Sequence, residues 1–448
     1  MYLLYSALLA AGLLVSLPYW LAQMLLQGKY RPGLPERLGK VPDRMSLHPK
    51  RPAIWIHAVS VGEVLAVTGL AAELKKRLPN YRLVVSTTTD TGQKLARARF
   101  GAENVFYFPL DFKFAIRSYL QWLHPELVVL AETEFWPNFL RLSHSSGARV
   151  AVVNARISDR SWPGYRRFRW LLARILKNVD LFLAQTAEDA RRLESIGAPP
   201  ERVQAVGNLK YDIPSPTALP IVASLRSALV QAGAGPVIVC GSTVEGEEPI
   251  LLVAFKNVLA IHPKAVMILA PRHPERFAAV AQVLEHLGIP FCQRSGWSGE
   301  PLAGAVLLLD TIGELSALYA LADVAFVGGS LVPRGGHNIL EPALHGVPIF
   351  VGNHTENFRD IVALFQSRDA VRVVGPDEFL PVLMQLLSHP EERAALGRRA
   401  AETLRSQTGA TQRTMDAIVK LLHSETPLVR GLSGQTSAGE GTRPTPST

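Results

Sequence analysis

Acidic and basic side chains follow several apolar runs of this sequence, at places where a parallel sheet would gather them. Glu63 follows the first run, Glu132 the fourth and Lys210 the seventh. A carboxylate at the start of a helix can take a proton from a hydroxyl nucleophile, and a lysine can stabilise a departing phosphate. Glu132 and Glu134 together also fit a paired-carboxylate site, or a helix start beside Trp136. The opposing interpretations, a glutamate that complements a helix dipole and a solvated lysine, stay open on position alone.

The stretch 324–348 has the pattern of an anion site. An apolar run ends in the glycine pair 328–329, a second pair stands at 335–336, and a helix-like segment begins near Asn338. Backbone N–H groups of such a loop and helix start can point at one phosphate. Glu341, in the first helical turn, could accept hydrogen bonds from the two vicinal hydroxyls of a ribose. A capping box formed by Asn338 and Glu341 explains the same pattern without a ligand.

Three further loops of the second half follow apolar runs. Small residues stand at 241–243, an arginine-histidine pair at 272–273, and a glycine-led segment at 313–315. Ligands of open parallel sheets bind at the carboxyl ends of strands, so we expect these loops and 335–341 to share one edge. Arg272 could bind a phosphate through two hydrogen bonds, whereas the small hydroxyl residues also fit helix N-caps. Convergence of the loops predicts nucleotide binding. The lack of an Asp-x-Asp-like acidic pair for a divalent metal predicts phosphate handling without a metal.

Apolar strand-like runs alternate with helix-like stretches from residue 50 onward. The runs are 53–58, 83–88, 105–108, 127–130, 150–153, 181–184 and 203–206 in the first half, and 237–240, 266–270, 290–293, 306–309, 324–327, 349–351 and 371–374 in the second. Such alternation predicts parallel sheets covered by helices on both faces. The proline-rich segment 211–219 separates the halves as a linker. We therefore predict an α/β protein with two Rossmann-like domains, residues 29–212 and 213–424, that face each other across a cleft.

The two ends of the chain differ from this body. Residues 1–28 carry no charged side chain and are long enough to cross a bilayer once. Positive residues follow at once, among them Lys29 and Arg31, which favours an uncleaved anchor with the rest of the chain in the cytoplasm over a signal peptide. Whether the anchor spans the bilayer or lies in its interface stays open. Residues 425–448 end in a stretch rich in Gly, Ser, Thr and Pro, and we expect a disordered tail.

Length and composition bound the class of protein. At 448 residues with 48% apolar content, the chain is globular and too long for one core. Cys240 and Cys292 stand far apart, which argues against a disulfide framework or a zinc site. A net charge of +9 suits nucleic acid, an anionic membrane or a phosphorylated substrate, and nucleic acid ranks last because no known nucleic-acid module is present. The basic, aromatic segment 165–177 fits docking on an anionic membrane or phosphorylated lipid, or a basic-faced helix on the protein's own core.

Motifs along the chain resemble, in order, those of the Kdo transferase family of lipopolysaccharide assembly. They are SVGE (60–63), ETEFWPN (132–138), NARIS (154–158), GNLKYD (207–212), STVEGEE (242–248), PRHPERF (271–277), TIGEL (311–315) and FVGGSLVPRGGHNILEP (326–342). The resemblance implies the GT-B glycosyltransferase fold. It also implies an inverting transfer of Kdo (3-deoxy-D-manno-octulosonic acid) from CMP-Kdo to a lipid A precursor, lipid IVA, by an enzyme anchored to the cytoplasmic face of the inner membrane.

The resemblance implies roles for individual residues as well. Glu63 resembles the general base that deprotonates the acceptor hydroxyl, and Glu132 and Lys210 resemble residues that support the transition state. CMP-Kdo is a donor substrate, so no cofactor and no metal ligand is implied. The positions that resemble CMP-binding ones are Arg272, His273, Gly313, Glu314, Leu315, Asn338, Ile339, Leu340 and Glu341, and Gly241 and Ser242 join them by their place at a strand end.

Two other functions remain alternatives. A nucleotide-sugar 2-epimerase would have the same fold and prefer UDP to CMP, but such enzymes are normally soluble. A non-catalytic, membrane-anchored binder of anionic glycolipid would leave Glu63 and the glycine loop without purpose. The sequence predicts neither an oligomeric state nor the number of Kdo units transferred.

Overall fold

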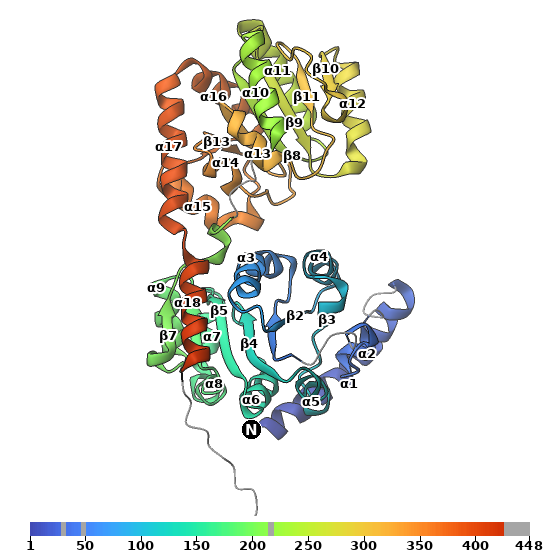
Figure 1. The fold of residues 1–448 in the computed structure, drawn as a ribbon, viewed down its shortest axis with the longest axis vertical. Helices are drawn as coiled ribbons and strands as arrows, with labels where there is room; N and C mark the ends of the chain where they lie inside the picture. Colours follow the sequence, from blue (N-terminus) through green and yellow to red (C-terminus); the bar gives the residue numbers. More distant parts are fainter. Residues whose placement is uncertain (28–32, 46–50, 214–218, 425–448) are drawn as a thin grey trace, which may run out of the picture.

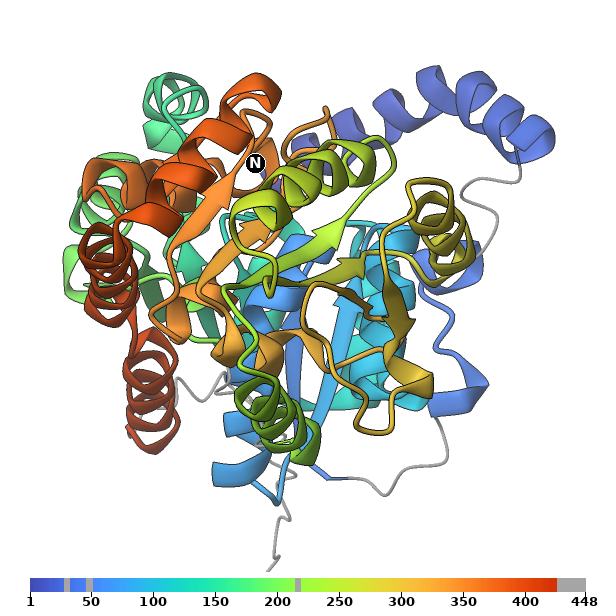
Figure 2. The same cartoon turned by 90° about the horizontal axis from the view of Figure 1, so that it is seen from above.

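The computed structural model describes residues 1–27, 33–45, 51–213 and 219–424. In this part of the chain, two α/β units, each built on a seven-stranded sheet, stack along the longest axis of the molecule (Figure 1). The N-terminal helix lies along the outside of the first unit (Figures 1 and 2). The predicted positive flank at Lys29 and Arg31, the middle of the predicted linker and the predicted tail lie outside the described residues.

The first sheet is parallel, with the strand order β3-β2-β1-β4-β5-β6-β7. Its strands are β1 (Ala53–His57), β2 (Arg82–Thr87), β3 (Val105–Tyr107), β4 (Pro125–Ala131), β5 (Arg149–Ala155), β6 (Leu181–Ala184) and β7 (Val203–Ala205). Its central strands are buried along nearly their whole length, which explains their continuous Val, Ile and Leu runs. Each predicted strand of the first half is confirmed within a few residues.

Helices cover both faces of the first sheet (Figure 1). They are α3 (Val61–Arg77), α4 (Asp90–Phe100), α5 (Lys113–Leu123), α6 (Pro137–Ser145), α7 (Trp162–Arg167), α8 (Arg169–Leu176) and α9 (Ala187–Ser195), after the short α2 (Leu34–Arg37). Single-turn 3-10 helices connect them, namely η1 (Asp43–Met45), η2 (Ala102–Asn104), η3 (Pro200–Arg202) and η4 (Leu209–Tyr211). A buried apolar cluster on each face holds the layers together, one around Trp55 and the other around Leu70.

The second sheet is also parallel, with the order β10-β11-β9-β8-β12-β13-β14. Its strands are β8 (Val237–Thr243), β9 (Val266–Pro271), β10 (Phe291–Gln293), β11 (Val306–Leu308), β12 (Val324–Val327), β13 (Ile349–Val351) and β14 (Arg372–Val373). Its helices are α10 (Pro220–Ala232), α11 (Glu248–Ile261), α12 (Phe277–His286), α13 (Leu315–Leu318), α14 (Leu340–Leu344), α15 (Arg359–Ser367), α16 (Pro376–Ser388) and α17 (Pro390–Gln407), with 3-10 turns η5 (Pro274–Arg276), η6 (Arg294–Gly296), η7 (Tyr319–Leu321) and η8 (Glu356–Phe358). The predicted pair of Rossmann-like sheets is confirmed.

The last helix, α18 (Ala410–His423), returns to the first unit (Figure 1). Its apolar face joins the buried cluster that α3 and β5 also form. Asp212 fixes the crossing point, because its carboxylate accepts hydrogen bonds from the N–H groups of Gly409, at 2.6 Å, and Thr411. The range 213–424 for a second domain stays a prediction, and it includes a helix whose packing partners belong to the first sheet.

Helix α1 (Tyr2–Gln27) is, among the described residues, the one helix long and apolar enough to cross a membrane. None of its most apolar stretch is buried. Its first turns contact the first unit, where Asn138 Nδ2 donates to Ser6 Oγ at 2.9 Å and the Arg141 guanidinium lies 4.4 Å from the centre of the Tyr2 ring. The remaining turns leave an apolar surface open, and such a surface marks a site of lipid or protein contact.

Candidate active site

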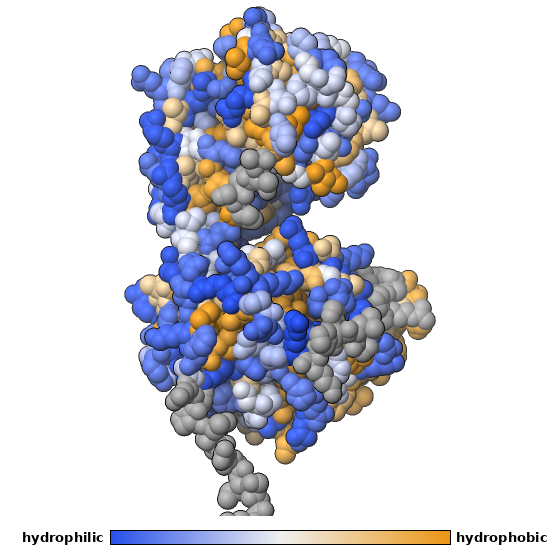
Figure 3. Space-filling model, viewed as in Figure 1, coloured by the Kyte–Doolittle hydropathy of each residue, from blue (hydrophilic) through white to orange (hydrophobic). Residues whose placement is uncertain are grey.

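The carboxyl edges of the two sheets meet at the junction of the units. Each strand order reverses once, between β1 and β4 and between β8 and β12, and such reversals open a crevice at the carboxyl ends of the strands. Arg156 directly follows β5, and its Nη1 atom lies 2.5 Å from Oδ2 of Asp360, at the start of α15. The two edges are therefore in contact at this point. Figure 3 shows a narrow waist between the units. The loops that carry the predicted residues therefore border this waist.

Glu63 lies in the first turn of α3, directly after β1, and its side chain is buried. Both carboxylate oxygens accept a hydrogen bond, one from the N–H of Val59 at 2.8 Å and one from the hydroxyl of Ser60 at 2.9 Å. Burial raises the pKa of Glu63 to about 7, and the charges of Glu132 and Glu134 add to the rise, against the two hydrogen bonds. Each oxygen keeps a second lone pair, so the carboxylate holds the turn before α3 and can still accept a proton.

Lys210 and Glu132 form an ion pair, with Nζ 3.2 Å from Oε1. Their side chains are 38% and 32% exposed, so both charged groups reach solvent. Glu134 stands beside them, and burial, followed by the charge of Glu132, raises its pKa. The structure thus brings Glu63, Glu132 and Lys210 to one edge, where the lysine supplies a cation among three carboxylates.

Three non-glycine residues near these strand ends have left-handed backbones. The φ angle is 56° at Glu132, 53° at Asn154 and 56° at Ser242. A side chain makes this conformation unfavourable, and it persists where surrounding contacts over-determine it, most often at functional sites. Asn154 entered the sequence analysis only as the first residue of the motif NARIS, without a role of its own.

The first glycine pair of the stretch 324–348 does not present its N–H groups to a ligand, which contradicts the anion site expected there. Glu247 is fully buried, and its carboxylate accepts hydrogen bonds from the N–H groups of Gly329, Ser330 and Leu331 at 2.8, 2.9 and 2.9 Å. The protein's own carboxylate therefore occupies the place of the expected anion. Sequence reasoning missed this residue because an acidic side chain before a helix usually complements the helix dipole.

A second cluster of polar groups forms around Arg272. Its guanidinium is exposed and has no hydrogen-bond or ion-pair partner within the described residues. Burial lowers the pKa of His337 to about 4, and the charges of Arg272 and His273 lower it further, so the imidazole is neutral at pH 7. Burial raises the pKa of Glu341, while the Asn338 side chain and the Arg272 charge oppose the rise. A cation, a neutral imidazole and a carboxylate thus share this edge, and His337 is an addition to the predicted set.

Other predicted nucleotide contacts are available chiefly through their backbone. The side chains of Leu315, Ile339 and Leu340 pack in the apolar clusters of the second unit. The carboxylate of Glu314 accepts a hydrogen bond from Arg294 at 2.9 Å. Within the described residues, no group of three or more His, Cys, Asp or Glu side chains gathers as a metal site.

The end of β8 is tightly packed. A Cβ added to Gly241 would lie 2.0 Å from the Tyr319 hydroxyl, so only glycine fits there. The interpretation of Ser242 or Thr243 as an N-cap is wrong, because Glu247 is the N-cap residue of α11. Strand-end placement of Gly241 and Ser242, by contrast, is as predicted.

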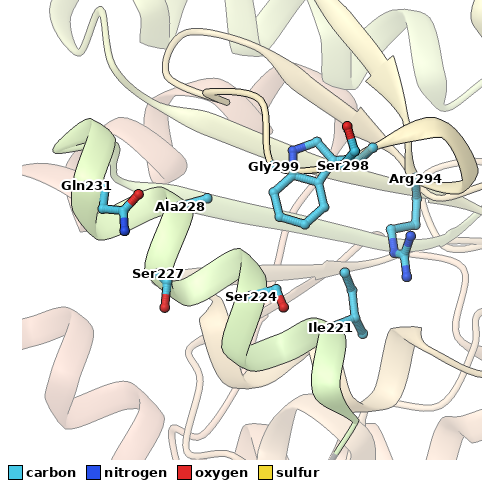
Figure 4. Close-up of a pocket in the computed structure, with 9 residues that line it drawn as sticks. Ile221, Ser224, Ser227, Ala228, Gln231, Arg294, Ser298 and Gly299 are labelled. Carbon is cyan, nitrogen blue, oxygen red and sulfur yellow. The ribbon is translucent and has the colours of Figure 1, made fainter.

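A pocket of about 360 Å³ lies on the flank of the second unit, between α10 and the loop after β10 (Figure 4). Ser224 and Gln231 line it from α10, and Arg294 and Trp297 line it from the loop. Arg294 of this lining pairs with Glu314, one of the predicted residues, and we treat the pocket as separate from the candidate site.

The basic segment 165–177 is divided between α7 and α8 at Phe168. Ile175 and Leu176 are buried in the first unit's core, which agrees with the core-packing interpretation for its last turn. Phe168 and Trp170 are exposed instead, and docking on a membrane or phosphorylated lipid stays a prediction.

Known proteins resemble this chain over most of its length. The family model for 3-Deoxy-D-manno-octulosonic-acid transferase (kdotransferase) matches residues 32–213. The 3-deoxy-D-manno-octulosonic acid transferase of Haemophilus influenzae is 35% identical over 87% of this chain and 91% of its own length. That of Bordetella pertussis is 36% identical over 90% and 95%. The crystal structure of UDP-GlcNAc 2-epimerase from Neisseria meningitidis is 13% identical to this chain, with a TM-score of 0.50. The alignment covers 82% of this chain and 100% of the epimerase chain, and the similarity concerns the fold alone.

Proposed function

This chain belongs to the 3-deoxy-D-manno-octulosonic acid (Kdo) transferase family, and on that premise we propose that it moves Kdo from CMP-Kdo to the lipid A precursor lipid IVA. Kdo transfer in lipopolysaccharide biosynthesis is the activity of the family. The donor nucleotide, the acceptor and the residue roles are the proposed parts. Glu63 carries the proposal, because it is a buried carboxylate of raised pKa beside a lysine–glutamate pair at the carboxyl edge of a sheet.

In the proposed reaction, a hydroxyl oxygen of the acceptor attacks the anomeric carbon of Kdo while Glu63 takes the hydroxyl proton. The bond from that carbon to the phosphate oxygen of CMP breaks, and its electron pair leaves with CMP. A single displacement inverts the anomeric centre. With a pKa of about 7, Glu63 is partly ionised at neutral pH and strong enough as a base to share the proton in the transition state.

The donor is proposed to bind at the edge of the second unit. The exposed Arg272 guanidinium is suited to the phosphate, and Glu341 to the ribose hydroxyls. Lys210 would stabilise charge on the leaving phosphate or on the Kdo carboxylate. Positive charge from these side chains supports a reaction without a metal ion. EDTA should therefore leave turnover unchanged. A rate that depends on added Mg²⁺ would count against the metal-independent mechanism.

The proposed location is the cytoplasmic face of the inner membrane. Helix α1, with its open apolar surface, supports membrane attachment. A lipid acceptor also requires an enzyme that works at a membrane surface.

The deciding experiment is mass spectrometry of lipid IVA incubated with CMP-Kdo and the protein, beside the Glu63→Gln variant. We expect stepwise gains of Kdo mass with the wild type and a rate about 100- to 10,000-fold lower with the variant, because general base catalysis is lost. Glu73→Gln is the matched control, since this partly exposed glutamate lies on the same helix and its one ion pair within the described residues is with Lys76, at 4.0 Å.

Other outcomes identify what is wrong. No mass gain with any of the proteins would remove the donor or acceptor assignment, and tighter binding of UDP than of CMP would then favour the epimerase. Binding of CMP without turnover would favour the glycolipid binder. Equal rates for wild type and Glu63→Gln would keep the transferase and remove Glu63 as the base.

A further inference from the structure

The segment that follows β7 crosses the sheet edge before it delivers Lys210. Strand β7 lies at the end of the first sheet, whereas Glu132 follows β4, with β5 and β6 between them. Lys210 nevertheless reaches Glu132. The chain from 207 to 211 therefore passes over the carboxyl ends of β6 and β5, and contacts made there decide where the lysine stands.

An amide side chain at each of these strand ends holds this segment. Gln185, after β6, accepts a hydrogen bond from Asn208 Nδ2 at 2.9 Å and donates to the Asn154 carbonyl at 3.0 Å. Asn154 Oδ1, at the end of β5, accepts the N–H of Leu209 at 3.0 Å. Asn208 Oδ1 accepts the N–H of Lys210 at 2.9 Å. Two consecutive N–H groups, those of Leu209 and Lys210, are thus held by one connected cluster of three amides.

The surroundings make this cluster rigid. Asn154 is 1% exposed, has a left-handed backbone, and its Nδ2 has no partner within the described part of the chain. Leu209 and Tyr211, on either side of Lys210, are buried. A left-handed backbone at a non-glycine residue persists where the surrounding contacts over-determine it, and such residues gather at functional sites.

We propose that Asn154, Gln185 and Asn208 are positioning residues of the transfer reaction, which fix the backbone of Lys210 so that its ammonium stays beside Glu132 and the leaving phosphate. The inference rests on the proposed function, in which Lys210 supports the transition state. A lysine carries its charge on a flexible stem, so the backbone must place it. Misplacement of a group by about 1 Å in an active site costs about 100-fold in rate.

A double-mutant cycle tests this. The kinetic constants kcat and KM are measured with CMP-Kdo and lipid IVA for the wild type, Asn208→Ala, Lys210→Ala and the double variant. We expect Asn208→Ala to lower kcat about 10- to 100-fold in the wild type, with KM for CMP-Kdo nearly unchanged. In the Lys210→Ala background the same substitution should change kcat by less than about twofold, because the group that it positions is gone.

A general structural role would lower kcat by the same factor in both backgrounds, and that result would overturn the proposal, as would an unchanged kcat for Asn208→Ala. If Asn208→Ala does not fold, Gln185→Ala replaces it in the cycle, because Gln185 is hydrogen-bonded to Asn208 and, within the described residues, not to Lys210. Gln185→Ala should lower kcat by a smaller factor, and it should leave kcat nearly unchanged in the Lys210→Ala background. Asn104→Ala is the control, since the side-chain hydrogen bonds of this amide, in the part of the chain that the structure describes, go to Phe100 and Glu103 of its own neighbourhood. A wild type that transfers no Kdo would overturn the proposed function and this inference together, whereas additive effects in an active enzyme overturn this inference alone.

Discussion

Glu63 must be ionised before it can accept a proton, so its raised pKa sets a pH limit on the reaction. With a pKa of about 7, the base form is scarce below about pH 6 and dominant above about pH 8. We expect kcat/KM to rise with pH and to reach half of its plateau near pH 7. Initial rates between about pH 5 and 9 measure this midpoint.

The neighbours of Glu63 provide the control for this pH profile. The charge of Glu134 is one cause of the raised pKa, so Glu134→Gln should move the midpoint to lower pH. Glu73→Gln, on the same helix but ten residues after Glu63 and partly exposed, should leave the midpoint of the pH profile unchanged. A wild-type midpoint near the ordinary value of 4.5 would show that a carboxylate without this burial controls the rate.

Lys210 is the cation at the same edge, and its loss should affect the chemical step. Lys210→Ala removes the charge that faces Glu132 at 3.2 Å, and we expect kcat to fall about 100- to 1,000-fold, as on loss of an oxyanion donor. Binding of CMP, measured by calorimetry, should persist because Arg272 and Glu341 belong to the second unit. Full turnover by Lys210→Ala would remove the lysine from the mechanism.

Residue types and their places at strand ends were enough to locate Glu63, Glu132 and Lys210, but not their surroundings. The helix-dipole and base interpretations of Glu63 put the same side chain in the same helical turn, so sequence alone left them open, and its place in the first turn of α3 is compatible with both. The Lys210–Glu132 pair depends on a loop that crosses two strand ends. The crossing loop is held by the Asn154 side chain, which accepts the N–H of Leu209 at 3.0 Å, and a β-strand pattern does not reveal this contact.

At the scale of elements, Asp212 joins the crossing point of the two units to the start of α18. Its carboxylate accepts the N–H groups of Gly409 and Thr411, which the helix leaves without intrahelical partners. Asp212→Ala should lower the free energy of unfolding by about 1 to 2 kcal/mol, as on loss of a helix cap. Urea unfolding measures this as a lower midpoint.

The control for this prediction lies on the same helix. Asp416 is exposed and pairs with Arg77 at 2.7 Å, and exposed ion pairs contribute little to stability. Asp416→Ala should therefore shift the urea midpoint less than Asp212→Ala. An equal shift would mean that the carboxylate of Asp212 does not cap α18.

Hydrophobic periodicity predicted the elements well because parallel strands buried on both faces need unbroken apolar runs. It could not predict which loop donors stay open to a ligand. The glycine pair 328–329 after β12 has the sequence of an anion site, yet the carboxylate of Glu247, from the turn between the neighbouring strand β8 and α11, fills it. A contact between residues some eighty positions apart in the chain is set by tertiary packing, which a local pattern does not contain.

The whole molecule places two chemically different edges opposite each other, one with carboxylates and Lys210, the other with Arg272, His337 and Glu341. Direct contact between them includes the exposed Arg156–Asp360 ion pair, whose side chains are 44% and 62% exposed. Such an exposed pair contributes little to stability in water, so it does not lock the units together. This arrangement suits a reaction in which the acceptor and the donor arrive on separate units and meet only at the waist.

Membrane attachment is the property of the whole molecule that α1 makes testable. Leu14 and Val15, near the middle of the helix, are 69% and 84% exposed, so lysines there disturb no contact of the fold. A lysine near the centre of a spanning helix costs about 2.5 to 3.5 kcal/mol. The Leu14→Lys/Val15→Lys variant should therefore no longer float with phosphatidylethanolamine–phosphatidylglycerol vesicles, while CMP binding stays unchanged. Val230→Lys, an equally exposed apolar position on α10 at 75%, should still float. If the double variant floated as well as the wild type, the protein would attach through another surface, and the exposed Phe168 and Trp170 would be the next positions to change.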